Sequence, residues 1–264
     1  MNNKFSIVIR NKDEAPALEN VLSILREIYY TDINEIIVVD NNSSDNSEEI
    51  ALSYNCKVVK IDNFSYGRAI NFGMEAAKSK YVLLLSAHAI PIGQGFFKNT
   101  FLAIKEQENV AGVRFINSFE NYNRAIQNNF KVTQPLKFGL TAGCCIINKD
   151  VWGRFKFNED LNAIEDKEWS ERVMHRGFEI LDLNETYFYF LKRDSKSLLN
   201  RFKNETIAEY QFSNNKFHSP LHSLASFFKK IILTNSLRYF KVVHNDFQML
   251  KAKIEIHNKL KKDE

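Results

Sequence analysis

The sequence predicts an α/β domain with a mostly parallel sheet and helices on both faces, followed by a helical extension. Short apolar runs alternate with stretches of helical periodicity through the first part of the chain, as in βαβ units. Several apolar runs end in polar side chains, which is typical of a parallel sheet that binds a ligand at its strand ends. Beyond residue 195 the pattern becomes helical. We therefore expect an α/β domain at residues 1–195 and a helical, basic, amphipathic extension at residues 196–264.

Apolar runs predict strands at residues 5–9, 35–39, 57–61, 81–85 and 110–116. The stretches between them predict helices at about 16–29, 45–54, 66–78 and 94–107. Pro16 suits the first turn of its helix, where a missing backbone N–H costs no hydrogen bond. Ser44 or Asp45 can cap the second helix.

Residues 117–140 show no clear periodicity and are rich in Asn, Gln, Phe and Tyr, so we expect a long functional loop there. An apolar run then predicts a strand at 144–147. We expect a helix at 166–176 that ends at Gly177, followed by strands near 179–182 and 186–191. Apolar residues at steps of three and four predict an amphipathic helix within 221–243.

The chain has 264 residues, enough for one large α/β domain or for a domain and an extension. Its net charge is +4, and residues 229–264 alone carry nine Lys and Arg against four Asp and Glu. Cys56, Cys144 and Cys145 form neither a CxxC pair nor a metal-binding spacing, which indicates a reduced, cytoplasmic chain. We expect no signal peptide. Because no apolar run reaches about 18–20 residues, we expect a soluble or peripheral protein.

The polar side chains at the strand ends are the first candidates for a binding site. The carboxyl ends of parallel strands meet at one edge of a sheet. This would bring together the acidic residues after the first two strands with an arginine of the first strand, namely Asp13, Glu14, Asp40, Asp45 and Arg10. Carboxylates there can accept hydrogen bonds from ribose hydroxyls or from a base N–H. Alternatively, these residues only form turns and cap helices.

Residues 36–45, IIVVDNNSSD, resemble the "VVDnnSsD" segment of the family-2 glycosyltransferases, and the likeness extends from about residue 5 to about residue 195. The resemblance implies a GT-A fold, which is Rossmann-like, and a nucleotide-sugar donor. It assigns Asp40 and Asp45 to the nucleoside, and it places Asp13 and Glu14 beside the base.

Residues 64–73, FSYGRAINFG, are similar to the "F.hG..rN.G" segment of bacterial glycosyltransferases, the rhamnosyltransferases among them. Arg68 and Asn71 share a helical face at this spacing. An arginine can hold a phosphate bidentately, and an asparagine can bond a base or a sugar, so both are donor-binding candidates. The alternative for Arg68 is a position on the helix surface.

Residues 86–91, SAHAIP, stand where the family has a DXD-type motif that holds Mg²⁺ or Mn²⁺ against the donor diphosphate. Ser86 and His88 occupy the two aspartate positions. Imidazole suits Mn²⁺ better than Mg²⁺, so His88 is a candidate metal ligand; without a metal it could donate an N–H to a phosphate. A family histidine after the late strand is also missing, and Lys192 and Arg193 stand there instead. These cations could neutralise the diphosphate, so a metal site and a metal-independent donor site both stay open.

Residues 164–169, IEDKEW, look like the family's "ED.eW..R" segment. By this likeness Asp166 is the general base on the acceptor hydroxyl, and Glu165 is the alternative base or an orienting partner. Trp169 could form the floor of the acceptor sugar, and Arg172 could hold Asp166 or a phosphate. Without the likeness, the segment would be an acidic helix N-terminus with Trp169 in the core.

The resemblance as a whole implies an inverting hexosyl- or deoxyhexosyltransferase. Its donor would be a dTDP-, UDP- or GDP-linked sugar, and its acceptor a glycan or a polyprenyl-linked oligosaccharide in capsule or lipopolysaccharide O-antigen synthesis. The alternative is a catalytically inactive, donor-binding relative that serves as a scaffold in a polysaccharide assembly complex. A nucleotidyltransferase is disfavoured, because residues 9–13 contain no glycine for a phosphate loop.

Three roles are open for the C-terminal helices. They could lie on an anionic membrane surface, at the cytoplasmic face of the inner membrane. They could instead form a homodimer, or pack on the α/β domain. Nucleic-acid binding is not expected, since the basic residues belong to no known binding module.

Overall fold

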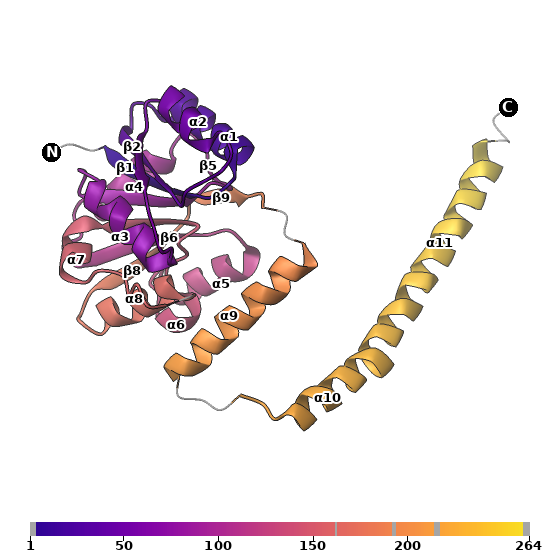
Figure 1. Cartoon of the computed structure of the whole chain (residues 1–264). Coiled ribbons are helices and arrows are strands. Elements are labelled where there is room, and N and C mark those ends of the chain that lie inside the picture. Colours follow the sequence, from indigo (N-terminus) through magenta and orange to yellow (C-terminus); the bar gives the residue numbers. More distant parts are fainter. Residues whose placement is uncertain (1–3, 162, 192–193, 214–216, 261–264) are drawn as a thin grey trace. The chain divides into compact units, whose positions relative to one another are not determined.

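The computed structural model describes residues 4–161, 163–191, 194–213 and 217–260 (Figure 1). The chain divides into two compact units, one up to Glu209 and one from Tyr210 onwards. The functional boundary expected at residue 195 stays a prediction, since compactness alone does not show where a function ends.

A seven-stranded sheet forms the centre of the first unit, with strand order β3-β2-β1-β4-β7-β6-β8. Its strands are β1 (Phe5–Asn11), β2 (Ile33–Asp40), β3 (Lys57–Lys60), β4 (Tyr81–Ser86), β6 (Val110–Phe115), β7 (Cys144–Asn148) and β8 (Glu179–Leu183). β7 runs antiparallel to its neighbours β4 and β6, whereas the other pairings are parallel. The predicted mostly parallel sheet is thereby confirmed.

A second, two-stranded sheet pairs β5 (Ala89–Ile92) with β9 (Thr186–Tyr189) in antiparallel fashion. Ala89 pairs with Tyr189, so the segment around His88 lies next to the end of β9. The sequence does not predict β5, because it is short and contains Pro91, which cannot donate to a strand ladder and is tolerated only at a sheet edge.

Helices cover both faces of the large sheet, as expected. α1 (Ala15–Ile28), α2 (Ser47–Ser53) and α4 (Phe96–Ile104) contribute to one hydrophobic core, and α3 (Tyr66–Ala76), α7 (Lys149–Arg154) and α8 (Glu165–Met174) contribute to the other. Successive strand residues point to opposite faces, so Ile7 and Ile9 of β1 belong to the first core and Val8 to the second.

Residues 117–140 are the main correction to the predicted elements. They contain two helices, α5 (Phe119–Gln127) and α6 (Pro135–Phe138), in place of one long loop. Ser118 caps α5 by accepting the Asn121 N–H. Ala125 is the one buried residue of α5, whereas Phe119, Tyr122 and Ile126, spaced by three and four residues, are exposed. The helical spacing is present in the sequence but extends over only nine residues.

The cysteines Cys56, Cys144 and Cys145 are free and buried. Burial raises the pKa of all three thiols, to about 11 for Cys56. Thiols in such surroundings pack as small apolar groups and are chemically inert.

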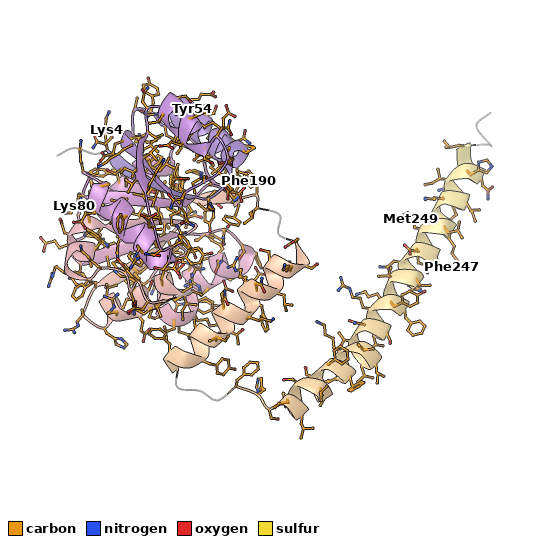
Figure 2. All side chains as sticks on the ribbon, viewed as in Figure 1. Lys4, Tyr54, Lys80, Phe190, Phe247 and Met249 are labelled. Atoms are coloured by element: carbon orange, nitrogen blue, oxygen red, sulfur yellow. The ribbon has the colours of Figure 1, made fainter. Side chains whose placement is uncertain are left out.

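α9 (Ser195–Ser213) leads into the second unit, which continues with α10 (Pro220–Lys229), a π-helical segment (Lys230–Asn235) and the long helix α11 (Ser236–Leu260). The large apolar side chains of α10 and α11 are exposed, among them Phe228, Phe240 and Phe247. Figure 2 shows Phe247 standing clear of the α11 ribbon. None of the described helices combines the length and the apolar character needed to cross a bilayer.

Candidate active site at the carboxyl edge of the sheet

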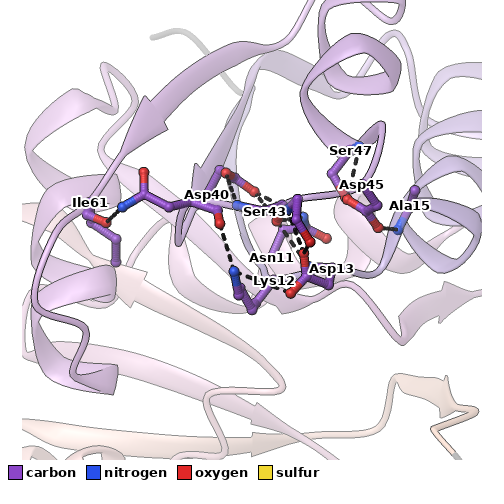
Figure 3. A network of polar contacts seen from close by, with 11 residues as sticks. Asn11, Lys12, Asp13, Ala15, Asp40, Ser43, Asp45, Ser47 and Ile61 are labelled. Carbon is purple, nitrogen blue, oxygen red and sulfur yellow. Dashed lines mark hydrogen bonds and ion pairs between the residues drawn. The ribbon is translucent and has the colours of Figure 1, made fainter.

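The carboxyl ends of β1 and β2 carry a tight network of polar contacts (Figure 3). Asp40 is buried and accepts hydrogen bonds from Asn11 Nδ2 at 3.1 Å, from the Ser43 hydroxyl at 2.5 Å and from the Ser43 N–H at 2.9 Å. The sheet register itself places Asn11 beside Asp40. The structure therefore brings the two strand ends together, and the Asp40 carboxylate organises the turn that follows β2.

Asp13 and Asp45 act as caps within the same network. Asp13 has a left-handed backbone (φ 50°) and accepts hydrogen bonds from the N–H and the hydroxyl of Ser44. The hydrogen bond from the Ser44 N–H lowers the pKa of Asp13. Asp45 accepts the Ala15 N–H at the start of α1 and hydrogen bonds from Ser47 of α2. These contacts match the turn-and-cap alternative, and the nucleoside contacts assigned to the three aspartates stay predictions.

Asn71 holds the loop that follows α7. Its Nδ2 donates to the Phe157 carbonyl oxygen and to Glu159 Oε1, both at 2.9 Å, and its Oδ1 accepts from Trp152 Nε1 and the Phe157 N–H, both at 3.0 Å. An amide donates two hydrogen bonds and accepts two, so this buried side chain has none left for a ligand. In the structure Asn71 therefore holds this loop, and its predicted donor contact stays a prediction.

Gly67 and Arg68 hold the same loop. A Cβ added at Gly67 would lie 2.1 Å from the Asn158 carbonyl oxygen, so α3 approaches the loop too closely for any side chain. Arg68 Nε donates to Glu159 Oε2 at 3.0 Å, and the Arg68 side chain is partly exposed. A phosphate contact for Arg68 stays a prediction, with Glu159 as its partner in the structure.

The two residues just before β7, Ala142 and Gly143, form backbone hydrogen bonds with candidate site residues from three other elements. The Ala142 N–H donates to Asp166 Oδ2 at 2.8 Å, and the Ala142 carbonyl oxygen accepts from Arg10 Nη2 at 2.8 Å. The Gly143 carbonyl oxygen accepts the Ser86 N–H at 2.9 Å. Two consecutive residues thus connect α8, β1 and β4.

The first turn of α8 presents two neighbouring carboxyl groups in different surroundings. Glu165 is buried, and its Oε1 lies 3.6 Å from Arg10 Nη1. Burial, and then the nearby charge of Asp166, raises the pKa of Glu165 to about 7. Asp166 is partly exposed, and its two oxygens accept the N–H groups of Ala142 and Lys167, each at 2.8 Å. Asp166 is therefore the carboxylate that a substrate can reach.

Lys167 and Ser170 fix the chain segment that leads to Ala142. Lys167 Nζ donates to the carbonyl oxygens of Gly139 and Leu140, both at 2.8 Å, and burial lowers the pKa of this lysine. Ser170 Oγ accepts the Leu140 N–H at 2.9 Å. Neither role is predicted from the sequence, because only the fold brings the segment before β7 next to α8.

Two of the three guanidinium nitrogens of Arg10 form no hydrogen bond with the described residues. Its Nε and Nη1 are buried and have no hydrogen-bond partner among the described residues, although Nη1 faces Glu165 in the ion pair. The Arg10 Cζ atom lies 5.5 Å from the centre of the Tyr66 ring. A buried guanidinium with unpaired N–H groups favours an anionic partner.

His88 is paired with Glu14, the residue that the family resemblance places beside the nucleobase of the donor. His88 Nε2 lies 3.1 Å from Glu14 Oε1, and the imidazole meets the rings of Tyr189 and Phe190 edge-on. Ser86 Oγ accepts the His88 N–H at 3.3 Å. The structure thus brings Ser86, His88 and Glu14 together at the end of β4.

Glu14 and His88, near the end of β4, could supply two of the ligands that a divalent cation needs. Two ligands at about 2.1–2.2 Å from one ion lie about 3 Å apart when they are neighbours, which matches the 3.1 Å between Glu14 and His88. Within the described residues, no group of three His, Cys, Asp or Glu side chains could hold a metal ion. Oxygens of the diphosphate would have to complete the coordination. A hydrogen-bonded Glu14–His88 pair beside a phosphate fits the same distance.

Trp169 does not have the surroundings that an acceptor floor requires, and Arg172 pairs with a glutamate of the same helix. Trp169 is fully buried, stacks on Phe157 with ring centres 5.1 Å apart, and donates its Nε1–H to the Phe155 carbonyl oxygen. A ring enclosed in the core cannot form the floor of a sugar site, so that prediction is wrong. Arg172 Nε donates to Glu168 Oε1 at 2.6 Å, and its predicted contact with Asp166 or a phosphate stays a prediction.

Two further candidates and two missed residues complete the site. Lys192 and Arg193 lie outside the described residues, so the cationic clamp stays a prediction. Tyr66 and Tyr189 are exposed aromatic residues beside Arg10 and His88. Neither tyrosine is predicted from the sequence as a site residue, because an aromatic residue in an apolar strand or at a helix start predicts a core position.

Comparisons with known proteins agree with this architecture. The family model "Glycosyl transferase family 2" matches residues 6–179. Among curated proteins, none matches the sequence of the chain.

Several solved structures share the fold. The mannosyltransferase PcManGT from Pyrobaculum calidifontis, in complex with GDP-Man and Mn²⁺, has a TM-score of 0.63 and 15% identity, covering 82% of this chain and 66% of that one. Glucosyl-3-phosphoglycerate synthase from Mycobacterium tuberculosis with phosphoglyceric acid has a TM-score of 0.61 and 15% identity, covering 79% of both chains. The same synthase with Mn²⁺, UDP-Glc and phosphoglyceric acid has a TM-score of 0.60 and 15% identity, covering 81% of both. These neighbours confirm the expected Rossmann-like GT-A fold.

Proposed function

The chain belongs to glycosyl transferase family 2, and from this premise we propose that it transfers a sugar, with inversion, from a nucleotide diphosphate donor to a glycan hydroxyl. The observation that carries the proposal is the accessible Asp166 carboxylate, held by the Ala142 N–H at 2.8 Å and next in sequence to the buried Glu165 that pairs with Arg10. A carboxylate base and a cation for the leaving group are the two groups that such a transfer requires.

Asp166 is the proposed general base. Each of its oxygens accepts one N–H and so keeps a lone pair for a proton. The acceptor oxygen attacks the anomeric carbon, the bond to the leaving diphosphate breaks, and the hydroxyl proton passes to the carboxylate. Glu165 orients Arg10 through their ion pair and is the alternative base, since its pKa of about 7 allows it to hold or release a proton near neutral pH.

The donor diphosphate is assigned to Arg10, with Arg68 as a second candidate. The unpaired N–H groups of Arg10 support this assignment. The nucleoside is assigned to the acidic strand ends of β1 and β2, with Asp13, Asp40 and Asp45 as candidates. The neighbouring structures contain GDP-Man or UDP-Glc, which supports a nucleotide-sugar donor, and dTDP-, UDP- and GDP-linked sugars all remain candidates.

Glu14 and His88 are the residues that would hold Mn²⁺ or Mg²⁺ in this proposal. A bound divalent cation would neutralise charge on the leaving diphosphate. In the metal-independent alternative, His88 donates its N–H to a phosphate and Glu14 orients the imidazole. The Mn²⁺ complexes of the neighbours support the first role, and the serine at position 86 supports the second, because it removes a carboxylate ligand.

The acceptor and the cellular role are proposed from the sequence resemblance. The segment at residues 64–73 is similar to rhamnosyltransferases, which supports a role in capsule or O-antigen synthesis on a glycan or polyprenyl-linked acceptor. Such acceptors are assembled at the cytoplasmic face of the inner membrane, where the basic C-terminal helices would hold the enzyme.

Asp166→Asn tests the proposal. We expect transfer and donor hydrolysis to fall at least about 100-fold, since general base catalysis contributes about that much, while the affinity for the matching nucleotide diphosphate is retained. Asp160→Asn, at an exposed aspartate ahead of α8, is the control and keeps its activity. Full activity in Asp166→Asn contradicts the base assignment. A wild-type protein that binds nucleotide but never turns over a nucleotide sugar supports the inactive scaffold instead.

Measuring nucleotide diphosphate binding with and without a metal ion also distinguishes the metal-dependent donor site from the metal-independent one. Thermal stabilisation by UDP, dTDP or GDP is measured in EDTA and in Mn²⁺. Stabilisation in EDTA supports the direct His88–phosphate contact. Stabilisation only in Mn²⁺ supports Glu14 and His88 as ligands, and Glu14→Gln then removes the Mn²⁺ effect. No stabilisation by any of the three nucleotides contradicts the donor site itself.

A further inference from the structure

The two carboxylate oxygens of Asp166 accept hydrogen bonds of different origin. Oδ1 accepts the N–H of the next residue, Lys167, at 2.8 Å, a contact that follows from the start of α8. Oδ2 accepts the Ala142 N–H at 2.8 Å, from a residue 24 positions away in the sequence. This second bond forms only if the segment before β7 is held in place beside α8.

The side chain of Lys167 connects that segment to α8. Its Nζ donates to the carbonyl oxygens of Gly139 and Leu140, both at 2.8 Å, three and two residues ahead of Ala142. Burial lowers the pKa of Lys167, and the nearby charge of Asp166 opposes this change. The ammonium group therefore interacts with the base through its charge and with the segment through two hydrogen bonds.

The backbone that Lys167 holds is enclosed. Gly139 and Leu140 are buried, and a Cβ added at Gly139 would lie 2.6 Å from the Cβ of Ser170. A buried carbonyl oxygen without a donor is unfavourable. Without the ammonium group, the peptide units of Gly139 and Leu140 would have to turn towards other donors, and the Ala142 N–H would move with them.

We propose that Lys167 is the positioning residue for the base: it holds the segment whose Ala142 N–H fixes Asp166 Oδ2. Lys167 acts through this backbone and not on the substrate itself. The two N–H groups leave each carboxylate oxygen one lone pair in a defined direction. A catalytic group that is displaced by about 1 Å can lose about 100-fold in rate. This assignment rests on the proposed transferase function.

Lys167→Met removes the charge and both hydrogen bonds but keeps an unbranched side chain. We expect kcat to fall about 10- to 100-fold, while the acceptor KM and the affinity for the nucleotide diphosphate stay within about twofold. Lys167→Arg keeps a cationic donor and should recover most of kcat. Lys167→Gln, a milder uncharged substitution, takes the place of Lys167→Met if that variant does not fold.

Lys149→Met is the matched control. Lys149 is also partly buried, and its Nζ donates to the Ala77 carbonyl oxygen. It follows the end of β7, which pairs with the start of β4, so it lies at the opposite edge of the sheet. Lys149→Met should therefore lower the denaturation midpoint but keep kcat. A kcat that falls no more in Lys167→Met than in Lys149→Met would overturn the proposal.

A double-mutant cycle shows whether Lys167 acts through Asp166. The base is already absent in Asp166→Asn, so adding Lys167→Met should have little further effect on the residual rate. A further loss as large as that in the wild-type background would overturn the proposal, because the two residues would then contribute independently.

Amide hydrogen exchange followed by NMR tests the positioning step without turnover. In Lys167→Met the Ala142 N–H should exchange at least about tenfold faster, since the segment opens more easily, whereas Lys149→Met should keep the wild-type rate. An unchanged Ala142 rate in Lys167→Met would overturn the proposal. If this rate rises but the wild-type protein transfers no sugar from any nucleotide donor, Lys167 still positions the segment and the transferase function alone fails.

Discussion

At the scale of single residues, Glu165 and Asp166 show how adjacent carboxyl groups acquire different properties. Glu165 points into the protein beside Arg10, and Asp166 points to the partly exposed edge, where backbone N–H groups hold it. A buried acid with a raised pKa, such as Glu165, is typical of functional sites.

The raised pKa of Glu165 makes stability depend on pH. The unfolded group ionises near its ordinary value of 4.5, whereas the folded group ionises at about 7. The contribution of Glu165 to stability is therefore fully present below pH 4.5 and is lost as the pH rises towards 7. Glu165→Gln removes this titration, so we expect the free energy of unfolding to fall less between pH 5 and pH 7.5, by about 2 kcal/mol.

Urea unfolding at the two pH values measures this difference. Glu19→Gln, at an exposed position of α1, is the control and should keep the wild-type pH dependence. An unchanged pH dependence in Glu165→Gln would show that Arg10 keeps Glu165 ionised throughout this range.

Sequence alone predicts a site residue well only when that residue lies at the end of a strand or in the first turn of a helix. Asp166 and Arg10 are such residues, and the fold brings both to Ala142. Trp169 fills the core and Asn71 holds a loop in the structure, because a polar or aromatic residue in a family-like segment can have a structural role. Tyr189 is not predicted as exposed, because an aromatic residue in an apolar strand is typical of a core position.

At the scale of elements, the glycine-containing segment at residues 64–73 packs α3 against the loop that follows α7. Gly67 allows the Asn158 carbonyl oxygen to approach, and Asn71 saturates its hydrogen bonds on Phe157, Glu159 and Trp152. This loop leads into α8, so the contact helps to position Asp166.

Gly67→Ala should therefore destabilise the protein by about 2 kcal/mol, because the new methyl group meets backbone that has to shift. Gly153→Ala is a matched control in another helix, α7, where an added Cβ meets nothing within 4 Å. It should stabilise the protein by about 0.5–1 kcal/mol through helix propensity. Chemical denaturation of both variants checks the pair, and equal effects would contradict the close approach.

Most elements of the first unit could be predicted because buried strands and amphipathic helices leave apolar patterns. β1, β2 and β4 consist almost wholly of buried residues. α5 is not predicted, because its apolar residues Phe119, Tyr122 and Ile126 have helical spacing over only nine residues, within a segment rich in Asn and Gln. β5 escaped because a four-residue edge strand containing Pro91 has no sequence signal of its own.

At the scale of the whole molecule, the second unit combines exposed apolar side chains with excess positive charge. We expect the full chain to bind vesicles that contain anionic lipid and to release them at high salt. Replacing Lys251 and Lys253 of α11 by Gln should weaken binding about 30-fold, at about 1 kcal/mol for each charge. Co-sedimentation with anionic and neutral vesicles measures this affinity.

The double variant Lys98→Gln/Lys105→Gln, at exposed positions in and after α4, controls for net charge and should bind like the wild type. Equal binding to neutral vesicles would contradict the electrostatic contribution. A protein that ignores vesicles but sediments as a dimer would assign the apolar helix surface to self-association.

The burial of Cys56, Cys144 and Cys145 gives the chain a practical property. Thiol-directed reagents attack the thiolate at an accessible sulfur, and all three sulfurs are enclosed and held protonated. A single cysteine introduced on the exposed face of α11 would therefore be the one position that takes a maleimide dye. The native chain serves as its own unlabelled background, so the surroundings of the C-terminal helix can be followed spectroscopically without first removing any natural residue.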